Sequence, residues 1–412
     1  MSCQATTLRP ADVIPSFDYA PLCWLAIGTF AVGTEGFMVA AILPDIGRDL
    51  AVSVPAAGQL ITIFALTYAF SSPVLTALTA NLDRRKLLIA SMAAFAAANV
   101  IAATASSFWF LAGARVLLAM AAGLYVPNAT SLAGAIVPPE RRGRALAIVT
   151  GGISIAVALG VPLGALTGAH FGWRMTFVGV AIMAAIALLG LLVGLERGIG
   201  SGLPIAVLRE RVAQVRRPAA LVGLLVTTLW ATGGFAVYTY VATFLATVTG
   251  LEGARVGYAL FAWGAAAFVG LLAGGLTSDR IGSRRVIAVV LPLFATALGT
   301  LSVSAHYLTP SQALAPVLIA LMVWGTAGWG FFPAQQARLI AITGLKGAPI
   351  ILSLNASFQY LGFALGAVLG SVVLTHAGLG DLGFAGATCV LAALALSELT
   401  DRFGRSNSGN GS

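Results

Sequence analysis

Two charged side chains lie deep inside apolar stretches, and they are the residues with which this sequence could do chemistry. Thirteen of the 14 acidic residues fall in loops, tails or the ends of apolar runs, and only Glu35 lies well inside one. Of the 23 basic residues, only Arg115 lies well inside an apolar run. Glu35 stands nine residues before Pro44 and Arg115 eight residues after Ser107, which places them about 13 and 12 Å from the same edge of a bilayer at 1.5 Å per residue.

A charge in the bilayer interior costs at least about 2.5–3.5 kcal/mol, so it rarely lacks a function. At one depth, Glu35 and Arg115 can form a pair or share a polar pocket. A carboxyl group among apolar side chains with an arginine nearby is balanced between binding and releasing a proton, so we predict that Glu35 carries protons and that Arg115 tunes it. The alternative is a permanently ionised pair that only stabilises the fold.

Polar and aromatic side chains within the apolar runs are the second group of candidates. Buried amide and phenol groups are costly unless they form hydrogen bonds, so they face a cavity or a partner helix. Asn355 and Gln359 are four residues apart and share one helix face. A flexible point is expected at Gly233-Gly234. Helix–helix contacts are the alternative role for the residues that we expect to line a substrate cavity, which are Tyr68, Asn128, Tyr238, Asn355 and Gln359.

Glycines recur at every fourth position in two of the apolar runs. These stripes are Gly160, Gly164 and Gly168, and Gly362, Gly366 and Gly370. Small residues on one face let helices approach closely. We expect the first stripe, with Pro162 bending its helix, to form a sliding interface between two halves of the molecule; simple tight packing is the alternative. The expected partner face carries Gly264, Gly270, Gly274 and Gly275.

The elements that position these residues must be membrane helices. Of 412 residues, 59% are hydrophobic and 9% are charged, whereas a soluble domain carries about 25% charged residues. This excludes a single soluble core, a disordered chain and a disulfide scaffold. The sequence predicts an all-α integral membrane protein with twelve spans, at 20–43, 55–79, 87–106, 108–134, 144–168, 174–194, 218–247, 255–278, 286–305, 312–337, 348–375 and 382–400.

The distribution of basic residues predicts the orientation. With a cytoplasmic N-terminus, inner segments hold nineteen Lys and Arg residues and outer segments hold three. This bias places both termini in the cytoplasm. The net charge of +9 therefore reflects topology, and no nucleic-acid partner is expected. The expected organisation is an N-terminal six-helix half at 1–195, a linker at 196–217, a C-terminal six-helix half at 218–402 and a disordered tail at 403–412.

A short motif repeats after the second and eighth spans. The second copy contains Gly275, Asp279, Arg280, Gly282, Arg284 and Arg285, and the first copy occupies 77–86. Parallel repeats of this kind mark transporters whose halves rock about a central site. We expect Asp279 to face a helix N-terminus across the interface between the halves, and the arginines to anchor at lipid headgroups.

The second copy resembles the signature of the major facilitator superfamily, G-x-x-x-D-R-x-G-R-R. In the first copy Ala77, Asn81, Leu82 and Arg84 replace signature residues. Arg115 begins a stretch similar to the R-x-x-x-G motif, whose arginine the family links to proton coupling. The fifth span is similar to the motif of its proton-linked exporters, in the residues Gly152, Gly160, Pro162, Gly164 and Gly168, which the resemblance links to gating.

The start of the first span, Thr34-Glu35-Gly36-Phe37, resembles bacterial drug:proton antiporters, including arabinose, nucleoside and chloramphenicol exporters. The resemblance implies a monomeric antiporter in the bacterial inner membrane, which exchanges protons for a small organic solute or drug by alternating access. An uptake symporter or uniporter of the same fold, or a membrane enzyme or sensor, are the alternatives. No phosphate loop, metal cluster or catalytic triad is visible, so we expect no cofactor and no enzymatic activity.

Overall fold

A computed structural model describes residues 19–199 and 216–409, and within these ranges the chain is helical without β-strands. Twelve helices in the described part are long and apolar enough to cross a membrane, which confirms the predicted fold class. The main helices are α1 (Ala20–Asp49), α2 (Val54–Leu78), α3 (Arg84–Ala103), α4 (Phe108–Ala135), α5 (Arg142–Ile155), α6 (Val161–Phe171), α7 (Trp173–Gly194), α9 (Pro218–Tyr238), α10 (Val241–Thr249), α11 (Ala254–Ile281), α12 (Ser283–Tyr307), α13 (Pro310–His376) and α14 (Leu382–Gly409).

Two spans depart from a single regular helix. In the fifth, α5 and α6 are joined by a five-residue π-helix, Ala156–Gly160, just before Pro162. The seventh, expected at 218–247, breaks between Tyr238 and Val241. The two glycines at which we expected a flexible point, Gly233-Gly234, are helical, and Gly233 packs against the backbone of α14.

Helix ends follow local sequence signals. Ser53, Asp83 and Ser107 accept hydrogen bonds at the N-termini of α2, α3 and α4, as short polar side chains do at N-caps. Gly282, with φ of 89°, separates α11 from α12, a conformation that only glycine adopts readily. Gly344, with φ of 73°, divides α13 into two spans, Pro310–Gly344 and Ile350–His376.

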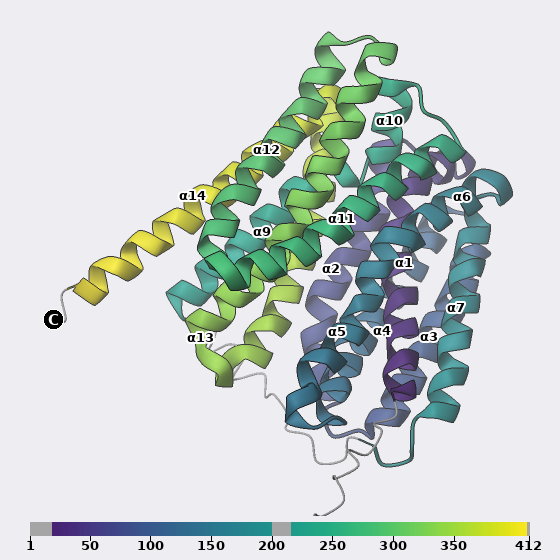
Figure 1. Ribbon diagram of the computed structural model, residues 1–412. Coiled ribbons are helices and arrows are strands. Elements are labelled where there is room, and N and C mark those ends of the chain that lie inside the picture. Colours follow the sequence, from purple (N-terminus) through teal and green to yellow (C-terminus); the bar gives the residue numbers. More distant parts are fainter. Residues whose placement is uncertain (1–18, 200–215, 410–412) are drawn as a thin grey trace, which may run out of the picture.

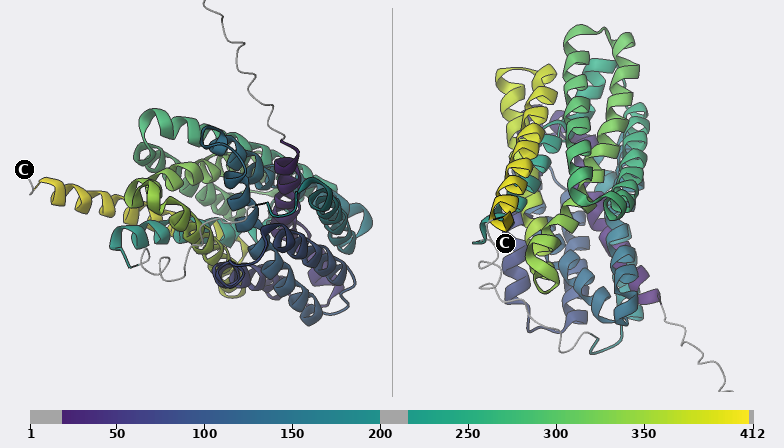
Figure 2. Two further views of the ribbon diagram at one scale, coloured as in Figure 1. Left: turned by 90° about the horizontal axis from the view of Figure 1, so that it is seen from below. Right: turned by 60° about the vertical axis from the view of Figure 1, so that its left-hand side comes forward.

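The helices gather in two groups (Figure 1). The first group, α1 to α7, is coloured purple to blue, and the second group, α9 to α14, is coloured teal to yellow. Residues 200–215 of the expected linker and 410–412 of the expected tail lie outside the described residues. Helix α14 continues to Gly409, so it covers most of the segment that we expected to be disordered, and it extends away from the bundle toward the C-terminus (Figure 2).

The two groups touch at the end of the bundle that carries the loop 50–53, which we name the outer end after the charge-based orientation; the opposite end is the inner end. There Ser371 of α13 donates a hydrogen bond of 3.3 Å to the carbonyl of Pro55 in α2. Tyr240 packs against Gly58 of α2, and Gly257 of α11 packs against Leu166 of α6. These contacts hold the two groups together at the outer end.

The glycine stripes pack inside the groups rather than between them, which corrects our expectation. Gly160, Gly164 and Gly168 face Thr34, Met38 and Ile42 of α1, in the same group. The face of the fifth span that meets α11 consists instead of backbone and larger side chains, and only Gly264 of the expected partner face touches it, at Val157 and Ala158. Within the second group, Gly270 and Gly274 pack on α13, and Gly362, Gly366 and Gly370 pack on α9.

This close packing predicts that a single methyl group destabilises the protein. A Cβ atom at Gly366 would lie 2.6 Å from the Thr232 carbonyl oxygen and 2.8 Å from the Phe235 Cβ. Because backbone cannot move aside, we expect Gly366→Ala to cost about 1–3 kcal/mol and to lower the melting temperature of the purified protein in detergent. Gly179→Ala is the control, since nothing lies within 4 Å of that Cβ position. Equal melting temperatures for the two variants would contradict this packing.

Candidate functional site

The structure brings together the two charges that the sequence singled out. Glu35 of α1 and Arg115 of α4 are both fully buried, and Nη1 of Arg115 donates to Oε1 of Glu35. Nε of Arg115 donates to the carbonyl of Leu60 in α2 at 3.3 Å. The guanidinium also stacks over the Phe64 ring, with Cζ 4.2 Å from its centre. Three helices of the first group therefore hold one ion pair in an apolar interior.

The pair leaves hydrogen-bonding capacity unused. Oε2 of Glu35 and Nη2 of Arg115 are buried and have no hydrogen-bond partner among the described residues, and the same holds for Oγ1 of Thr34. Buried polar atoms are satisfied in most proteins, so each unpaired one needs an explanation, such as a bound water or a role in proton transfer. An unpaired carboxylate oxygen is the atom on which a proton can be taken up without first breaking the contact between Oε1 and Arg115.

Aromatic rings connect this ion pair to the second group. The Phe64 ring under Arg115 lies 6.4 Å from both Tyr68 of α2 and Tyr360 of α13. Tyr68 and Tyr360 stack on each other with ring centres 3.7 Å apart. Tyr360 is also close enough to interact electrostatically with both Glu35 and Arg115. The expected cavity residue Tyr68 therefore forms part of a contact between the two groups.

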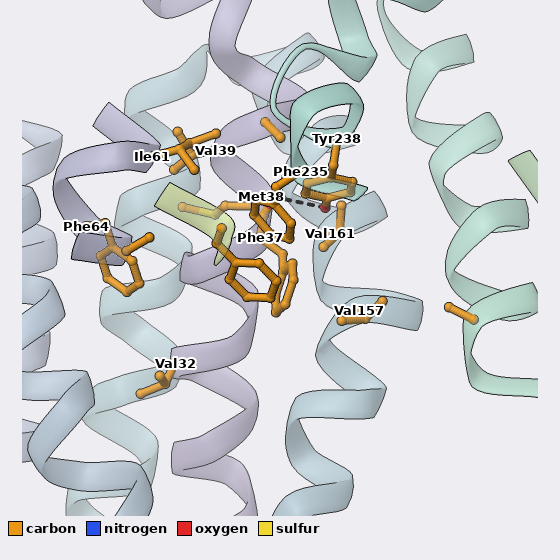
Figure 3. Close-up of a cluster of buried hydrophobic side chains, with 14 of the residues drawn as sticks. Val32, Phe37, Met38, Val39, Ile61, Phe64, Val157, Val161, Phe235 and Tyr238 are labelled. Atoms are coloured by element: carbon orange, nitrogen blue, oxygen red, sulfur yellow. Dashed lines mark hydrogen bonds between the residues drawn. The ribbon is translucent and has the colours of Figure 1, made fainter. Parts of the chain in front are cut away.

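A second contact between the groups is an aromatic box, by which we mean Phe235, Tyr238, Trp329 and Phe363. The ring of Phe37, on α1, lies inside it, 5.9–6.0 Å from each of the four ring centres. The hydroxyl of Tyr238 donates to the Phe37 carbonyl at 3.1 Å. Figure 3 shows Phe37 beside Phe235 and Tyr238, with this hydrogen bond dashed. All four walls belong to α9 and α13 of the second group.

A small cavity adjoins the box inside the second group. Its walls include Trp230, Trp263, Trp324 and Phe294 together with the four box residues. The cavity has a volume of about 30 Å³, which is room for about two water molecules. In this conformation the side chains therefore fill nearly all of this space. Nε1 of Trp263 is buried here and has no acceptor among the described residues.

A polar network lies in the second group, where the sequence predicted cavity residues. Oγ1 of Thr227 in α9 donates to Oδ1 of Asn355 at 2.7 Å. Gln335 donates to the Gly223 carbonyl at 2.6 Å and to Thr227 at 3.2 Å. Gln359, one turn beyond Asn355, is also buried. The network links α9 to both spans of α13, so Asn355 is held by neighbouring helices.

The remaining expected cavity residue, Asn128 of α4, is bound by the first loop motif. Nη1 of Arg84 donates to Oδ1 of Asn128 at 2.7 Å, and both residues are buried. Asp83 caps α3 by accepting from the Lys86 amide. Arg85 donates to two carbonyls near the end of α7. The charged residues of the first motif copy therefore bind within the first group.

The second copy of the motif has its first two charged side chains exposed in this structure. Gly275 packs near Pro333 and Gly282 forms the turn described above. Asp279 and Arg280 are exposed, and no hydrogen bond or ion pair joins either to another described residue, so the expected contact of Asp279 with a helix across the interface is not formed. The reason is that the groups meet at the outer end and this loop lies at the inner end. Arg285 is exposed, and Arg284 pairs with Glu398 of α14 at 2.9 Å.

Sequence reasoning missed several residues of this site. Phe37 and Tyr360 carry the contacts between the groups, but aromatic residues in an apolar run give no signal of a special role. The predicted span at 312–337 leaves Arg338 just outside it, whereas Arg338 is buried inside α13 and donates hydrogen bonds to Ser397 of α14. Its position near the end of a long helix could have been recognised only if the span had been extended past residue 337.

Known proteins resemble this chain along most of its length. Residues 25–367 match the family model of the Major Facilitator Superfamily. The MFS-type transporter YbcL of Bacillus subtilis, whose function is not characterised, is 34% identical over 376 residues, which are 91% of this chain and 94% of that protein. A chloramphenicol resistance protein of Streptomyces lividans is 32% identical over 382 residues, again 91% and 94% of the two chains.

Among solved structures, a bacterial homologue of the human lysosomal transporter Spinster has the same fold, with a TM-score of 0.75 and 19% identity over 93% of this chain and 96% of that one. The family match spans the ion pair, the fifth-span motif and the aromatic box alike. The helical architecture, the matched residues and the relatives agree, and this chain belongs to the major facilitator superfamily of membrane transporters.

Proposed function

We propose that the protein is a proton-coupled exporter of a small organic solute or drug, which works as an antiporter by alternating access. The observation that carries this proposal is the fully buried ion pair between Glu35 and Arg115. Such a pair is costly to bury, and hydrophobic residues of similar size are often as stable. Its presence within a transporter of this family therefore favours a role in coupling rather than in stability.

The free oxygen of the pair supports a simple exchange. Oε2 of Glu35 has no partner among the described residues, so it can accept a proton when water reaches the site. Protonation removes the negative charge and leaves Arg115 without its counter-ion, next to Phe64 and within electrostatic reach of Tyr360. The loss of one charge thus changes the energy of the contact between the groups, which is what coupling requires.

The conformation supports loading from the inner end. Contacts at Pro55, Gly58 and Gly257 close the outer end, while the signature residues Asp279 and Arg280 are exposed at the inner end. In an exporter this state receives substrate from the cytoplasm. We propose that the protein works as a monomer. We also propose a bacterial inner membrane, which the bacterial relatives support, and cytoplasmic termini, which the charge bias supports. The relative named for chloramphenicol resistance supports export of a drug.

Glu35→Gln tests the proposed proton coupling in proteoliposomes that contain a trapped pH dye. In the wild type, addition of a transported compound moves protons in the direction opposite to the compound. We expect Glu35→Gln to abolish this proton movement, a loss of at least about tenfold, because the amide cannot exchange a proton. Sugars, nucleosides and lipophilic drugs are first screened in the same assay with the wild type to find a compound that the protein transports.

Asp45→Asn is the matched control on the same helix, since Asp45 is partly exposed and its ion pair among the described residues is a surface pair with Arg48. We expect this variant to keep wild-type proton movement. Transport in which protons and compound move in the same direction would overturn export in favour of uptake. Unchanged coupling in Glu35→Gln would remove Glu35 from the mechanism.

A pair of variants separates the effect of the ion pair on stability from its role in proton coupling. Arg115→Met leaves a carboxylate without its partner in an apolar interior. We therefore expect the free energy of unfolding to fall by about 3–5 kcal/mol and the melting temperature to fall clearly. The double variant Glu35→Gln, Arg115→Met removes both charges and should recover most of that stability. Thermal melting in detergent measures both variants.

The transport assay on the same double variant then gives the decisive comparison. A stable protein without proton coupling is the expected result, because the pair serves function. If the double variant were as unstable as the single one, the pair would be a structural element, and the argument from its cost would fail.

A further inference from the structure

The Phe37 ring lies among aromatic rings of the other helix group. It comes from α1 of the first group, whereas the four rings around it come from α9 and α13 of the second group. Two of them, Phe235 and Phe363, stack with centres 3.7 Å apart and form one continuous wall. A box that accepts one planar ring from outside its own group has the shape and the surface to accept another.

The neighbouring cavity has a hydrogen-bond donor in its wall, on Trp263. The indole nitrogen of Trp263 can only donate a hydrogen bond, and it is buried without an acceptor among the described residues. The Trp263 ring lies 4.9 Å from that of Tyr238, so the free donor is one ring beyond the box. A buried donor without a partner is costly, and a ligand that brings an acceptor oxygen removes that cost.

The charge of the ligand follows from the lining. The described residues around the cavity are aromatic rings, Ala231 and two glycines, with no charged side chain among them. The nearest acid at this depth, Glu35, is engaged by Arg115 on the other side of α1. A ring face attracts cations, but a cation here would be buried without a counter-ion. The surroundings therefore favour a neutral ligand.

We propose that the aromatic box and its adjoining cavity form the substrate site, that the substrate is a neutral, planar aromatic compound with a hydrogen-bond acceptor, and that its ring takes the place of Phe37. This rests on the proposed export function and specifies its substrate class. One hydrogen bond, from the Tyr238 hydroxyl to the Phe37 carbonyl, holds α1 to this wall of the box. The ring of Phe37 can leave when the two groups separate, which enlarges the small cavity.

Three tricyclic probes of similar size test the proposal by equilibrium dialysis against the protein in lipid nanodiscs, with empty nanodiscs as the blank. Fluorenone is neutral with one carbonyl acceptor, fluorene lacks the acceptor, and N-methylacridinium is cationic. We expect fluorenone to bind roughly threefold to tenfold more tightly than fluorene, which is the range of one hydrogen bond. We expect the cation to bind more weakly than fluorenone.

Two variants test the two parts of the site. Phe37→Ala empties the box, so we expect fluorenone and fluorene to bind at least about threefold more tightly than to the wild type. Trp263→Phe removes the donor, so the ratio of fluorenone to fluorene affinity should fall to about one. Trp109→Phe is the matched control, because Trp109 is 79% exposed and far from the box in its contacts. If Phe37→Ala does not fold, the ratio in Trp263→Phe decides alone.

The proposal is overturned if Phe37→Ala weakens binding or leaves it unchanged, if the affinity ratio in Trp263→Phe stays at the wild-type value, or if N-methylacridinium binds best. The dialysis uses no proton gradient, so it is independent of the export mechanism. If binding follows these expectations but no proton-coupled transport is found, the proposed export function is wrong and the proposed binding site stands. If the protein couples protons to the transport of other compounds but shows none of these binding effects, the export function stands and the proposed binding site is wrong.

Discussion

Two charges in an apolar interior must stay together, and the first group of helices is arranged around that requirement. Glu35 and Arg115 come from α1 and α4, and Arg115 also bonds to the Leu60 carbonyl and covers Phe64, both in α2. Removing either charge leaves the other buried without a partner, which costs more than the pair gains. The relative position of these three helices is thereby fixed at the depth of the pair.

Packing inside each group differs from packing between them. Glycine stripes bring α9 and α13 into backbone contact, and they let side chains of α1 lie directly on the fifth span, so that an added methyl group would collide in either place. Between the groups, side-chain contacts such as Tyr68 on Tyr360 and Tyr238 on the Phe37 carbonyl accompany a backbone contact of Gly264 with Val157 and Ala158. The proposed alternating access requires each group to move as a body, so the contacts between the groups are the ones that must break and re-form.

The sequence predicted the parts of this arrangement that depend on length and depth. Twelve spans follow from apolar runs, and Glu35 and Arg115 meet because equal rise per residue puts them at one level. It could not predict which neighbour a glycine stripe faces, because a stripe defines a close contact but not its partner. The ring of Phe37 and the helix break after Tyr238 were missed for a related reason, since both depend on packing between helices distant in sequence.

Helix α1 connects the two sites through its own geometry. Glu35 and Phe37 are two residues apart, which is a turn of about 200° around the helix axis, so their side chains leave on opposite sides. One side chain faces Arg115 in the first group, and the other fills the aromatic box of the second. A small rotation or shift of α1 must therefore disturb both contacts together. In the proposed exporter, protonation of Glu35 loosens α1 on one side, and the Phe37 ring leaves or enters the box on the other, so that the proton and an aromatic substrate are coupled by the rigidity of a single helix.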